Sequence, residues 1–307
     1  MAINPEALCV GELLVDLVAT RPGPDPPGFA KFAGGAPANV AVGLARLGAR
    51  VAFAGRVSED RLGSFLIATL EREGVETRWL RRSREPTGLA FVYLGRGGER
   101  TFDFHRTGSA DMALGPEDLP AFGRGLRLLH CGSGPLLAPR GPAALRRAVA
   151  RAGRLGVPVS FDPNMRRDHP FPRPFLRWLL ARTDLLLLTE EEARIVTGAR
   201  APDRAARALL RRFGPEWLAL KRGARGSLLF HEGERISLPA FRVRAADTTG
   251  AGDGFAAALL FGLLRGWPAG KMGRFANAAG ALVCTRPGAM TALPTLARLE
   301  RFAGRQA

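Results

Sequence analysis

Residues 246–255, Ala-Asp-Thr-Thr-Gly-Ala-Gly-Asp-Gly-Phe, combine residue types at a spacing that suits chemistry on anions. They form a glycine-rich turn that leads into the apolar run Phe255–Leu264, which predicts a helix. The first N–H groups of a helix have no partner within it, and together with the helix dipole they bind anions. Asp253 would stand in that anion site, where a carboxylate serves as a base or as a metal partner. Alone, such an aspartate is more often a helix cap, and no Gly-Lys-Ser/Thr follows to make a Walker loop.

A second glycine turn lies far upstream, in residues 32–48, Phe-Ala-Gly-Gly-Ala-Pro-Ala-Asn-Val-Ala-Val-Gly-Leu-Ala-Arg-Leu-Gly. Gly34 and Gly35 predict a tight turn, and Pro37 suits the first turn of the helix that follows. Asn39 would lie in that first turn, where an isolated asparagine is usually just a solvated polar residue.

Together the two segments resemble the two signatures of the ribokinase-like (PfkB) family of sugar kinases, and the resemblance covers nearly the whole chain. It implies one kinase domain over residues 1–307, with a Rossmann-like, mostly parallel sheet flanked by helices and a small β-sheet lid. It also implies ATP and Mg²⁺ as cofactors, and a sugar as the second substrate.

Composition limits the alternatives. The hydrophobic fraction of 46% over 307 residues fits a globular protein, and no apolar run approaches the roughly 20 residues that span a bilayer. Three scattered cysteines and no evident signal peptide lead us to expect a cytoplasmic protein. The net charge is +17, yet the arginines are spread along the chain and aromatic residues are sparse. We therefore expect a genome-level bias in composition and no nucleic-acid partner.

Strand-like runs alternate with helical ones, which predicts an α/β fold with ligands at the carboxyl ends of the strands. The predicted strands are Leu8–Val18, Arg50–Arg56, Leu126–Cys131, Val157–Asp162, Asp184–Thr189, Trp217–Lys221 and Ser227–His231. The predicted helices are Ala36–Leu47, Arg61–Glu73, Arg140–Leu155, Glu190–Thr197, Pro202–Phe213, Gly252–Leu264 and Ala269–Thr285.

One stretch departs from this alternation. Thr87–Leu94 and Glu99–Arg106, joined by Gly95–Gly98, predict a β-hairpin. By the resemblance, this hairpin and Leu13–Lys31 form a lid over the sugar, often packed against a second subunit, so a homodimer is expected. The alternative is an ordinary edge hairpin.

The resemblance assigns the chemistry of phosphoryl transfer to the downstream turn. Asp253 would take the proton from the primary hydroxyl of the sugar. The amides of Gly250, Ala251 and Gly252 would form an anion hole for the transferring phosphoryl group.

Sugar binding is assigned by the resemblance to polar groups around the cleft. Asp16 matches an aspartate at the end of the first strand, and Gly34, Gly35 and Asn39 match a sugar-contacting turn. Arg106 matches a lid arginine of fructokinase-like members.

Further residues match the phosphate side of the family's site. Arg166, in an Asp-x-Asn-x-Arg element, would neutralise phosphate, and Lys221 would contact the phosphates or ribose of ATP. Glu192 would support Mg²⁺ through water, although Thr189 replaces the usual asparagine of that motif. The alternative for Glu192 is that acidic residues here only complement a helix dipole.

The nucleotide and cation sites complete the assignment. Gly223 and Gly226 match a turn beside the nucleotide, and Asn277 matches the adenine pocket. A loop that holds a monovalent cation such as K⁺ in many relatives is matched by Asp247, Thr249, Val283, Arg286 and Gly288.

The motifs together look most like those of a fructokinase acting on a ketose. A 2-keto-3-deoxygluconate kinase is the nearest alternative, because Arg106 or Arg166 could supply the cation that an acid substrate needs. Ribokinase and nucleoside kinase remain open, and a non-catalytic sugar-binding protein or a nucleic-acid binder would be a different class. The choice of sugar stays open at this point.

Overall fold

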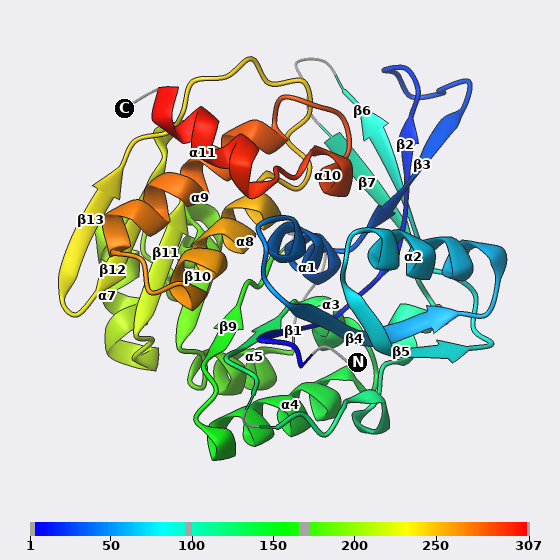
Figure 1. Cartoon of the computed structure of the whole chain (residues 1–307), viewed down its shortest axis with the longest axis horizontal. Coiled ribbons are helices and arrows are strands. Elements are labelled where there is room, and N and C mark those ends of the chain that lie inside the picture. Colours follow the sequence, from blue (N-terminus) through cyan, green and yellow to red (C-terminus); the bar gives the residue numbers. More distant parts are fainter. Residues whose placement is uncertain (1–3, 96–99, 124, 166–171, 306–307) are drawn as a thin grey trace.

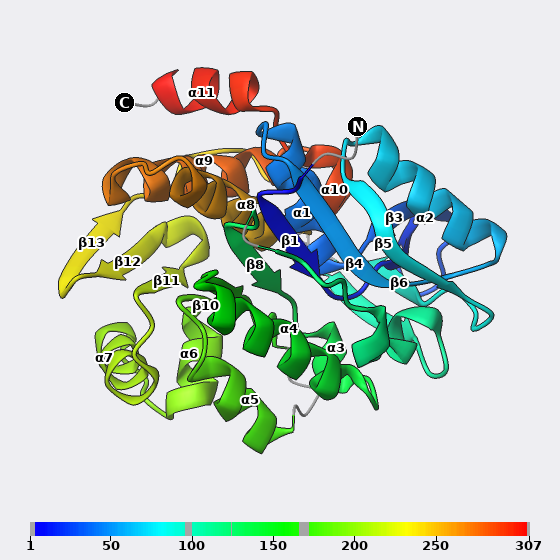
Figure 2. The same cartoon turned by 60° about the horizontal axis from the view of Figure 1, so that its bottom comes forward.

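The computed structural model describes residues 4–95, 100–123, 125–165 and 172–305. Within these ranges the chain forms two sheets and two layers of helices (Figures 1 and 2). The larger sheet consists of β1 (Ala7–Val10), β4 (Val51–Ser58), β5 (Glu76–Ser83), β8 (Leu128–Cys131), β9 (Val159–Phe161), β10 (Leu185–Thr189), β11 (Trp217–Lys221), β12 (Ser227–His231) and β13 (Glu234–Leu238).

The order of strands in the larger sheet is β13-β12-β11-β10-β9-β8-β1-β4-β5. All pairs from β5 to β11 are parallel, and β12 and β13 add an antiparallel edge. Parallel strands are covered on both faces, which is why β10 is a run of buried leucines, Leu185–Leu188. The predicted α/β fold with a mostly parallel sheet is confirmed.

Helices cover both faces of this sheet through two separate hydrophobic clusters. One face carries α1 (Ala36–Arg46), α2 (Arg61–Arg72), α8 (Ala251–Leu264), α9 (Ala269–Val283) and α11 (Leu296–Arg305). The other carries α4 (Gly141–Leu155), α5 (Arg173–Leu180), α6 (Glu190–Thr197) and α7 (Pro202–Phe213), and the short helices are α3 (Gly134–Leu137) and α10 (Ala289–Ala292).

The smaller sheet has the order β3-β2-β6-β7 and stands beside the larger one (Figure 1). Its strands are β2 (Leu14–Ala19), β3 (Phe29–Gly34), β6 (Leu89–Leu94) and β7 (Arg100–His105). Strands β6 and β7 are antiparallel, which confirms the predicted pairing. Residues 96–98 of the predicted connection and Glu99 of the predicted second strand lie outside the described residues.

The prediction of one strand over Leu8–Val18 was wrong. The segment divides into β1 of the larger sheet and β2 of the smaller one. The chain passes so close to Pro37 at Gly11 that a Cβ there would lie 2.3 Å from the proline ring. Asp16 consequently lies within β2, paired with Phe32 and Ala90, and not at the end of the first strand.

The strands β5 and β13 and the helices α5 and α11 were not predicted. Both strands lie at sheet edges and contain several charged residues, so neither forms an apolar run in the sequence. Along the described residues, no helix combines the length and apolarity that crossing a membrane requires.

Two helices of the same face approach each other unusually closely. Gly43 of α1 meets Ala257 of α8, and a Cβ on Gly43 would lie only 2.5 Å from the Ala257 methyl group. Because Asn39 and Asp253 each lie four residues, about one turn, before these contact positions, the close packing brings their side chains together.

Candidate active site

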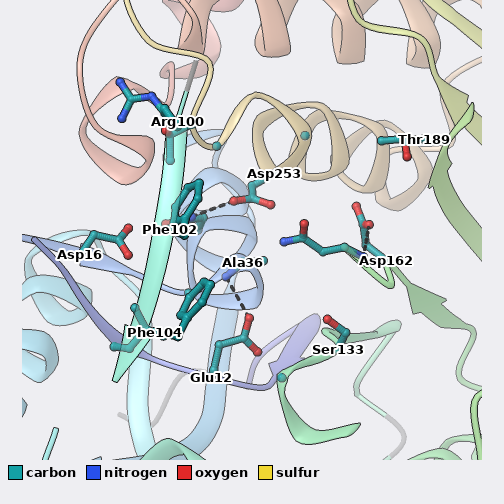
Figure 3. A pocket seen from close by; sticks show the side chains of 18 of the residues that line it. Glu12, Asp16, Ala36, Arg100, Phe102, Phe104, Ser133, Asp162, Thr189 and Asp253 are labelled. Atoms are coloured by element: carbon teal, nitrogen blue, oxygen red, sulfur yellow. Dashed lines mark hydrogen bonds between the residues drawn. The ribbon is translucent and has the colours of Figure 1, made fainter. Parts of the chain in front are cut away.

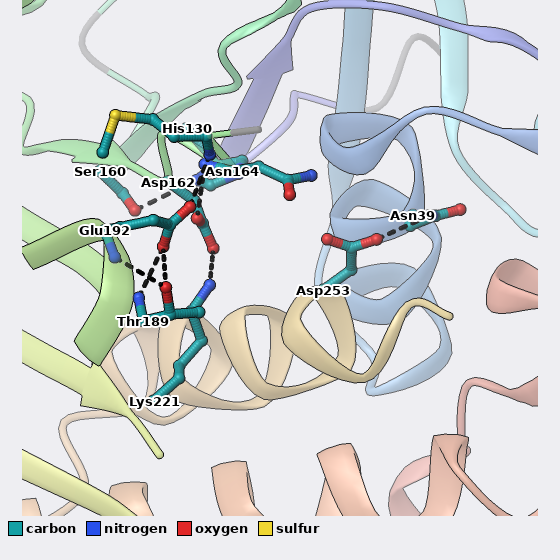
Figure 4. A network of polar contacts seen from close by, with 10 residues as sticks. Asn39, His130, Ser160, Asp162, Asn164, Thr189, Glu192, Lys221 and Asp253 are labelled. Atoms are coloured by element: carbon teal, nitrogen blue, oxygen red, sulfur yellow. Dashed lines mark hydrogen bonds and ion pairs between the residues drawn. The ribbon is translucent and has the colours of Figure 1, made fainter. Parts of the chain in front are cut away.

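Asp253 and Asn39 meet at the N-terminal ends of α8 and α1. The Asn39 Nδ2 group donates a hydrogen bond of 2.7 Å to Oδ2 of Asp253 (Figure 4). Burial raises the pKa of Asp253 to about 7, and the nearby carboxylate of Asp162 adds to that effect. The Asn39 hydrogen bond and the Lys221 ammonium act in the opposite direction. A carboxyl with a pKa near neutrality is well suited to act as a general base.

The turn before α8 exposes backbone donors beside Asp253. Gly250 adopts the left-handed conformation, with φ of 77°, and its missing Cβ lets the turn pack against Ala289. Among the described residues, the amides of Gly250 and Gly252 have no hydrogen-bond partner, while Ala251 donates to the Thr248 carbonyl at 3.2 Å. Within the described ranges, two of the three predicted anion-hole donors therefore have no protein acceptor.

These groups border a cavity of about 650 Å³ between the two sheets (Figure 3). Its walls come from the N-terminal ends of α1 and α8, the carboxyl ends of central strands, and strand β7. The predicted site residues that line it are Asp16, Gly35, Asn39, Arg106, Thr189, Glu192, Lys221, Thr249, Gly250, Gly252 and Asp253.

Lys221 links this cavity to a second one of about 880 Å³ on the other side of the turn. Lys221, Thr248 and Gly252 line both cavities. The second cavity also contains the predicted nucleotide residues Gly223, Gly226 and Asn277, together with Ala251.

Asn277 shapes the second cavity by holding its rim. Its Nδ2 group donates to the carbonyls of Leu238 and Pro239, at 3.2 and 2.9 Å. Gly226 has φ of 82°, and a Cβ there would lie 2.0 Å from the Leu238 carbonyl, so only glycine fits beside that rim.

The Lys221 ammonium forms a 2.5 Å ion pair with Asp162, at the carboxyl end of β9 (Figure 4). Burial works to lower the pKa of Lys221, but Asp162 and Glu192 outweigh it and the pKa is raised. The lysine is therefore charged, and it places a largely enclosed positive charge at the junction of the two cavities.

Thr189 and Glu192 form a reciprocal cap at the start of α6. Glu192 Oε2 accepts from the Thr189 amide and hydroxyl at 2.6 and 2.9 Å, and the Thr189 hydroxyl accepts from the Glu192 amide. Burial raises the pKa of Glu192, and its Oε1 also accepts from the Met165 amide at 2.6 Å. The threonine thus supports Glu192 within the wall of the first cavity.

Strand β7 contributes a wall that the sequence reasoning identified only in part. Arg100, Phe102, Phe104 and Arg106 all line the first cavity. Only Arg106 was predicted, although a period of two along a strand places the other three on the same face. Arg106 is held by Asp111, through Nε at 2.7 Å and Nη2 at 2.6 Å.

The floor near β2 contains Asp16 and a further carboxyl, Glu12, which was not predicted as a site residue. Gly34 leaves room for Asp16, because a Cβ there would lie 2.3 Å from the aspartate oxygen. Glu12 accepts from the Ala36 amide at 3.2 Å, and burial raises its pKa. Asp162 and Ser133 also line the cavity, and each follows the carboxyl end of a parallel strand. Because ligands bind at the carboxyl ends of such strands, this position could have identified both residues from the sequence.

The residues matched to a cation loop surround Asp247, outside the lining of either cavity except for Thr249. Asp247 accepts from the Thr249 and Gly288 amides, each at 2.7 Å, and pairs with Arg100 of β7 at 2.8 Å. The Val283 carbonyl accepts from the Arg286 amide at 3.4 Å. Their predicted role remains a prediction, as does that of Arg166, which lies outside the described residues.

Comparison with known proteins identifies the family of this chain and several of its relatives. A family model described as pfkB family carbohydrate kinase matches residues 4–296. The fructokinase of Klebsiella pneumoniae is 39% identical over 311 residues, which cover 97% of this chain and 99% of that protein.

Two solved structures have the same fold along almost the whole chain. The fructokinase of Xylella fastidiosa with bound ATP gives a TM-score of 0.89 at 30% identity, covering 98% of this chain and 99% of that one. A double mutant of the Vibrio cholerae fructokinase, in its fructose, ADP and potassium ion bound form, gives a TM-score of 0.89 at 33% identity. The match covers 98% of this chain and 100% of that one. With a family model that matches most of its length, the chain belongs to the pfkB family of carbohydrate kinases and is a phosphotransferase with an alcohol group as acceptor.

Proposed function

We propose that this protein transfers the γ-phosphoryl group of ATP to the primary hydroxyl of fructose. The observation that carries the proposal is the half-buried Asp253 carboxyl, whose pKa is raised to about 7 and which lies at the turn that borders both cavities. One cavity then holds the acceptor and the other the nucleotide. The curated relative and the solved structures cited above, at 30 to 39% identity, are fructokinases.

Asp253 removes the proton from the sugar hydroxyl, and the oxygen then attacks the γ-phosphorus in line with the departing ADP. The free amides of Gly250 and Gly252 stabilise the negative charge on the transferring group. Lys221 adds a positive charge from the junction of the two cavities. The proton is held on the Asp253 carboxyl until the product leaves.

ATP occupies the second cavity, with Gly223, Gly226 and Asn277 beside the nucleoside. Mg²⁺, when bound with ATP, neutralises phosphate charge. Glu192, supported by Thr189, faces the phosphate side of the first cavity and would hold the ion through water. Because Glu192 is already engaged with three backbone and hydroxyl donors, contact through water fits it better than direct coordination.

The charges of the first cavity favour a neutral ketose over a 2-keto acid. Arg100, Arg106 and Lys221 are the cationic residues that line it in the described part of the chain, and each is paired with an aspartate. A carboxylate substrate would need an unpaired cation. Polar groups suited to sugar hydroxyls come from Asp16, Asn39 and the backbone of Gly35, while Gly34 makes room for Asp16.

The small sheet then serves as the lid, approximately residues 13–31 and 87–106 of one kinase domain. Its β7 face covers the first cavity, while Phe29, Phe91 and Tyr93 cluster together, with ring centroids 5.1 to 5.7 Å apart. We infer that this aromatic cluster packs against a second subunit in a homodimer, which light scattering of the purified protein would test. We further infer a cytoplasmic enzyme.

The test is ADP release with Mg²⁺-ATP against fructose, 2-keto-3-deoxygluconate, ribose, tagatose and adenosine. Fructose is expected to give the highest kcat/KM. A preference for the keto acid would overturn the charge argument above. Sugar binding without ADP release from any acceptor would instead indicate a non-catalytic sugar-binding protein.

A further inference from the structure

We propose that the carboxamide of Asn164 donates a hydrogen bond to the phosphoryl group during its transfer, on the side opposite the anion hole. The inference rests on the proposed function and adds one catalytic residue to it. Asn164 lies in the loop that follows β9, a loop that the preceding sections describe only through its neighbours Asp162 and Met165.

The backbone of Asn164 adopts a conformation that few residues accept. Its φ is 40°, in the left-handed region, and in the described part of the chain Glu232 is the other non-glycine residue with positive φ. Asparagine tolerates this region better than most residues, but the conformation still stores strain. Strain of this kind persists where the surrounding structure fixes it, and it is concentrated at functional sites.

Side chains fix the loop on both sides of Asn164. Asp162 accepts the Asn164 amide through Oδ1 at 3.2 Å, and its Oδ2 pairs with Lys221 at 2.5 Å. On the other side, the Met165 amide donates to Glu192 at 2.6 Å. The loop therefore holds Asn164 in one position before any substrate binds, as preorganised catalysis requires.

The Asn164 side chain has no protein partner and faces the first cavity. It is exposed, it lines that cavity, and its carboxamide extends from the end of β9 toward Asp253 (Figure 4). Within the described ranges, its one hydrogen bond is the backbone bond to Asp162. A carboxamide carries two N–H donors and an acceptor oxygen, so this group is available to a ligand.

The neighbours of Asn164 favour the phosphoryl group over the sugar as that ligand. Transfer spreads negative charge over three phosphoryl oxygens. Among the described residues, the unpaired amides of Gly250 and Gly252 face the site from the start of α8, and Lys221 lies beside them, since a Cβ on Gly252 would be 3.5 Å from Nζ. Asn164 faces that turn from the end of β9 (Figure 4). Its Nδ2 therefore serves the oxygens that point away from the turn.

Asn164 gains and loses no atom in the reaction. The sugar oxygen forms a bond to phosphorus and its proton passes to Asp253, while the bond from phosphorus to the ADP oxygen breaks and its electron pair leaves with ADP. The hydrogen bond from Asn164 stabilises the negative charge between these events. Loss of this donor should consequently reduce kcat more than it raises KM.

The test uses Asn164→Gly, which removes the carboxamide and leaves a residue that adopts positive φ without strain. Glu232→Gly is the matched control. Glu232 has φ of 50° in the turn between β12 and β13, its side chain is 82% exposed, and it lies outside both cavities. ADP release is measured with the acceptor that gives the highest kcat/KM in the panel above, and Tm is measured without substrates.

A second readout is the affinity for ADP with aluminium fluoride, a planar mimic of the transferring phosphoryl group, in the presence of the same acceptor. Because the panel selects the acceptor, an error in the identity of the sugar would not mask the result.

Both glycine variants should keep a Tm close to that of the wild type, because relief of strain offsets the added freedom of the unfolded chain. Asn164→Gly alone should lose about 10²-fold in kcat, the typical cost of one donor to developing negative charge. It should bind ADP with aluminium fluoride about 10²-fold more weakly, with unchanged affinity for ADP alone. Asn164→Asp, which replaces the donors with a negative charge, should have a lower kcat still.

Three results would overturn the inference. One is a raised KM with unchanged kcat in Asn164→Gly, which would place the carboxamide on the sugar. Another is wild-type kcat together with wild-type affinity for ADP with aluminium fluoride. The third, a wild type that releases no ADP with any acceptor, would refute the proposed function itself and the inference with it. If Asn164→Gly lowers Tm where Glu232→Gly does not, Asn164→Asp, which tolerates positive φ, serves in its place.

Discussion

The floor and the wall of the sugar cavity are built by different rules. On the floor, Asn39 and Asp253 extend from the first turns of two helices that touch through Gly43 and Ala257. The wall consists of alternate residues from Arg100, the first residue of β7, to Arg106, which directly follows that strand. Strands β2 and β3 of the same four-stranded sheet contribute Val15 and Ala33 to the main core. The floor is thus anchored in the largest hydrophobic cluster, whereas the wall depends on its own sheet and on two ion pairs.

This difference suggests a division of labour. Groups that must be held in place for bond making lie on the floor, and groups that recognise the sugar and enclose it lie on the wall. Substitutions on the floor should then reduce kcat, while substitutions on the wall should act mainly on KM. The following experiments test that division, from the largest expected effect to the smallest.

The largest effect is expected from Asp253→Asn. The amide cannot accept the hydroxyl proton, and losing a general base typically costs about 10² to 10⁴ in rate. Calorimetry should still detect fructose binding, since the wall is unchanged. Turnover close to that of the wild type would contradict the assignment of the base.

Gly43→Val tests whether helix proximity positions the base. Overpacking against Ala257 should destabilise the protein by about 1–3 kcal/mol. Separation of the helices should also reduce kcat by roughly tenfold or more, because the Asp253 carboxyl moves away from its position beside the turn. Gly153→Val is the matched control, because a Cβ on that helical glycine of α4 meets nothing within 4 Å. Equal loss of kcat in both variants would refute the positioning argument.

Arg106→Gln tests the wall. Loss of a charged hydrogen-bond donor should raise KM for fructose about tenfold while kcat changes little. Arg235→Gln removes an exposed ion pair with Asp203 and should leave both constants unchanged. A loss confined to kcat in Arg106→Gln would remove the distinction between floor and wall.

The smallest effect is a shift of the pH profile in Asn39→Ala. Wild-type kcat/KM should fall below a pH of about 7, because protonated Asp253 cannot act as a base. The Asn39 hydrogen bond favours the charged carboxylate, so its loss should move that acidic limb upward by about one pH unit. If kcat/KM of the variant falls at the same pH as that of the wild type, Asn39 does not lower the pKa of Asp253.

The sequence predicted the parts of the site that follow from local backbone rules. The turn at Gly250–Gly252 and the helix after it could be predicted because glycine and helix termini have strong local preferences. The Lys221–Asp162 pair could not, because it joins two strands through a side-chain contact with no local signal. The division between β1 and β2 was missed because apolar residues flank Gly11 and Glu12 on both sides, whereas the close approach of Gly11 to Pro37 is a contact distant in the sequence.

The hydrogen bond between Asn39 and Asp253 spans 214 positions of the sequence, and this has a consequence for folding. Contacts of such separation form late, because a long loop must close before they add stability. A chain that has emerged only as far as β11 has no base, however well its earlier strands have assembled. Recovery of phosphorylating activity after dilution from denaturant should therefore coincide with the slowest refolding phase, which makes catalysis a reporter of the completed fold.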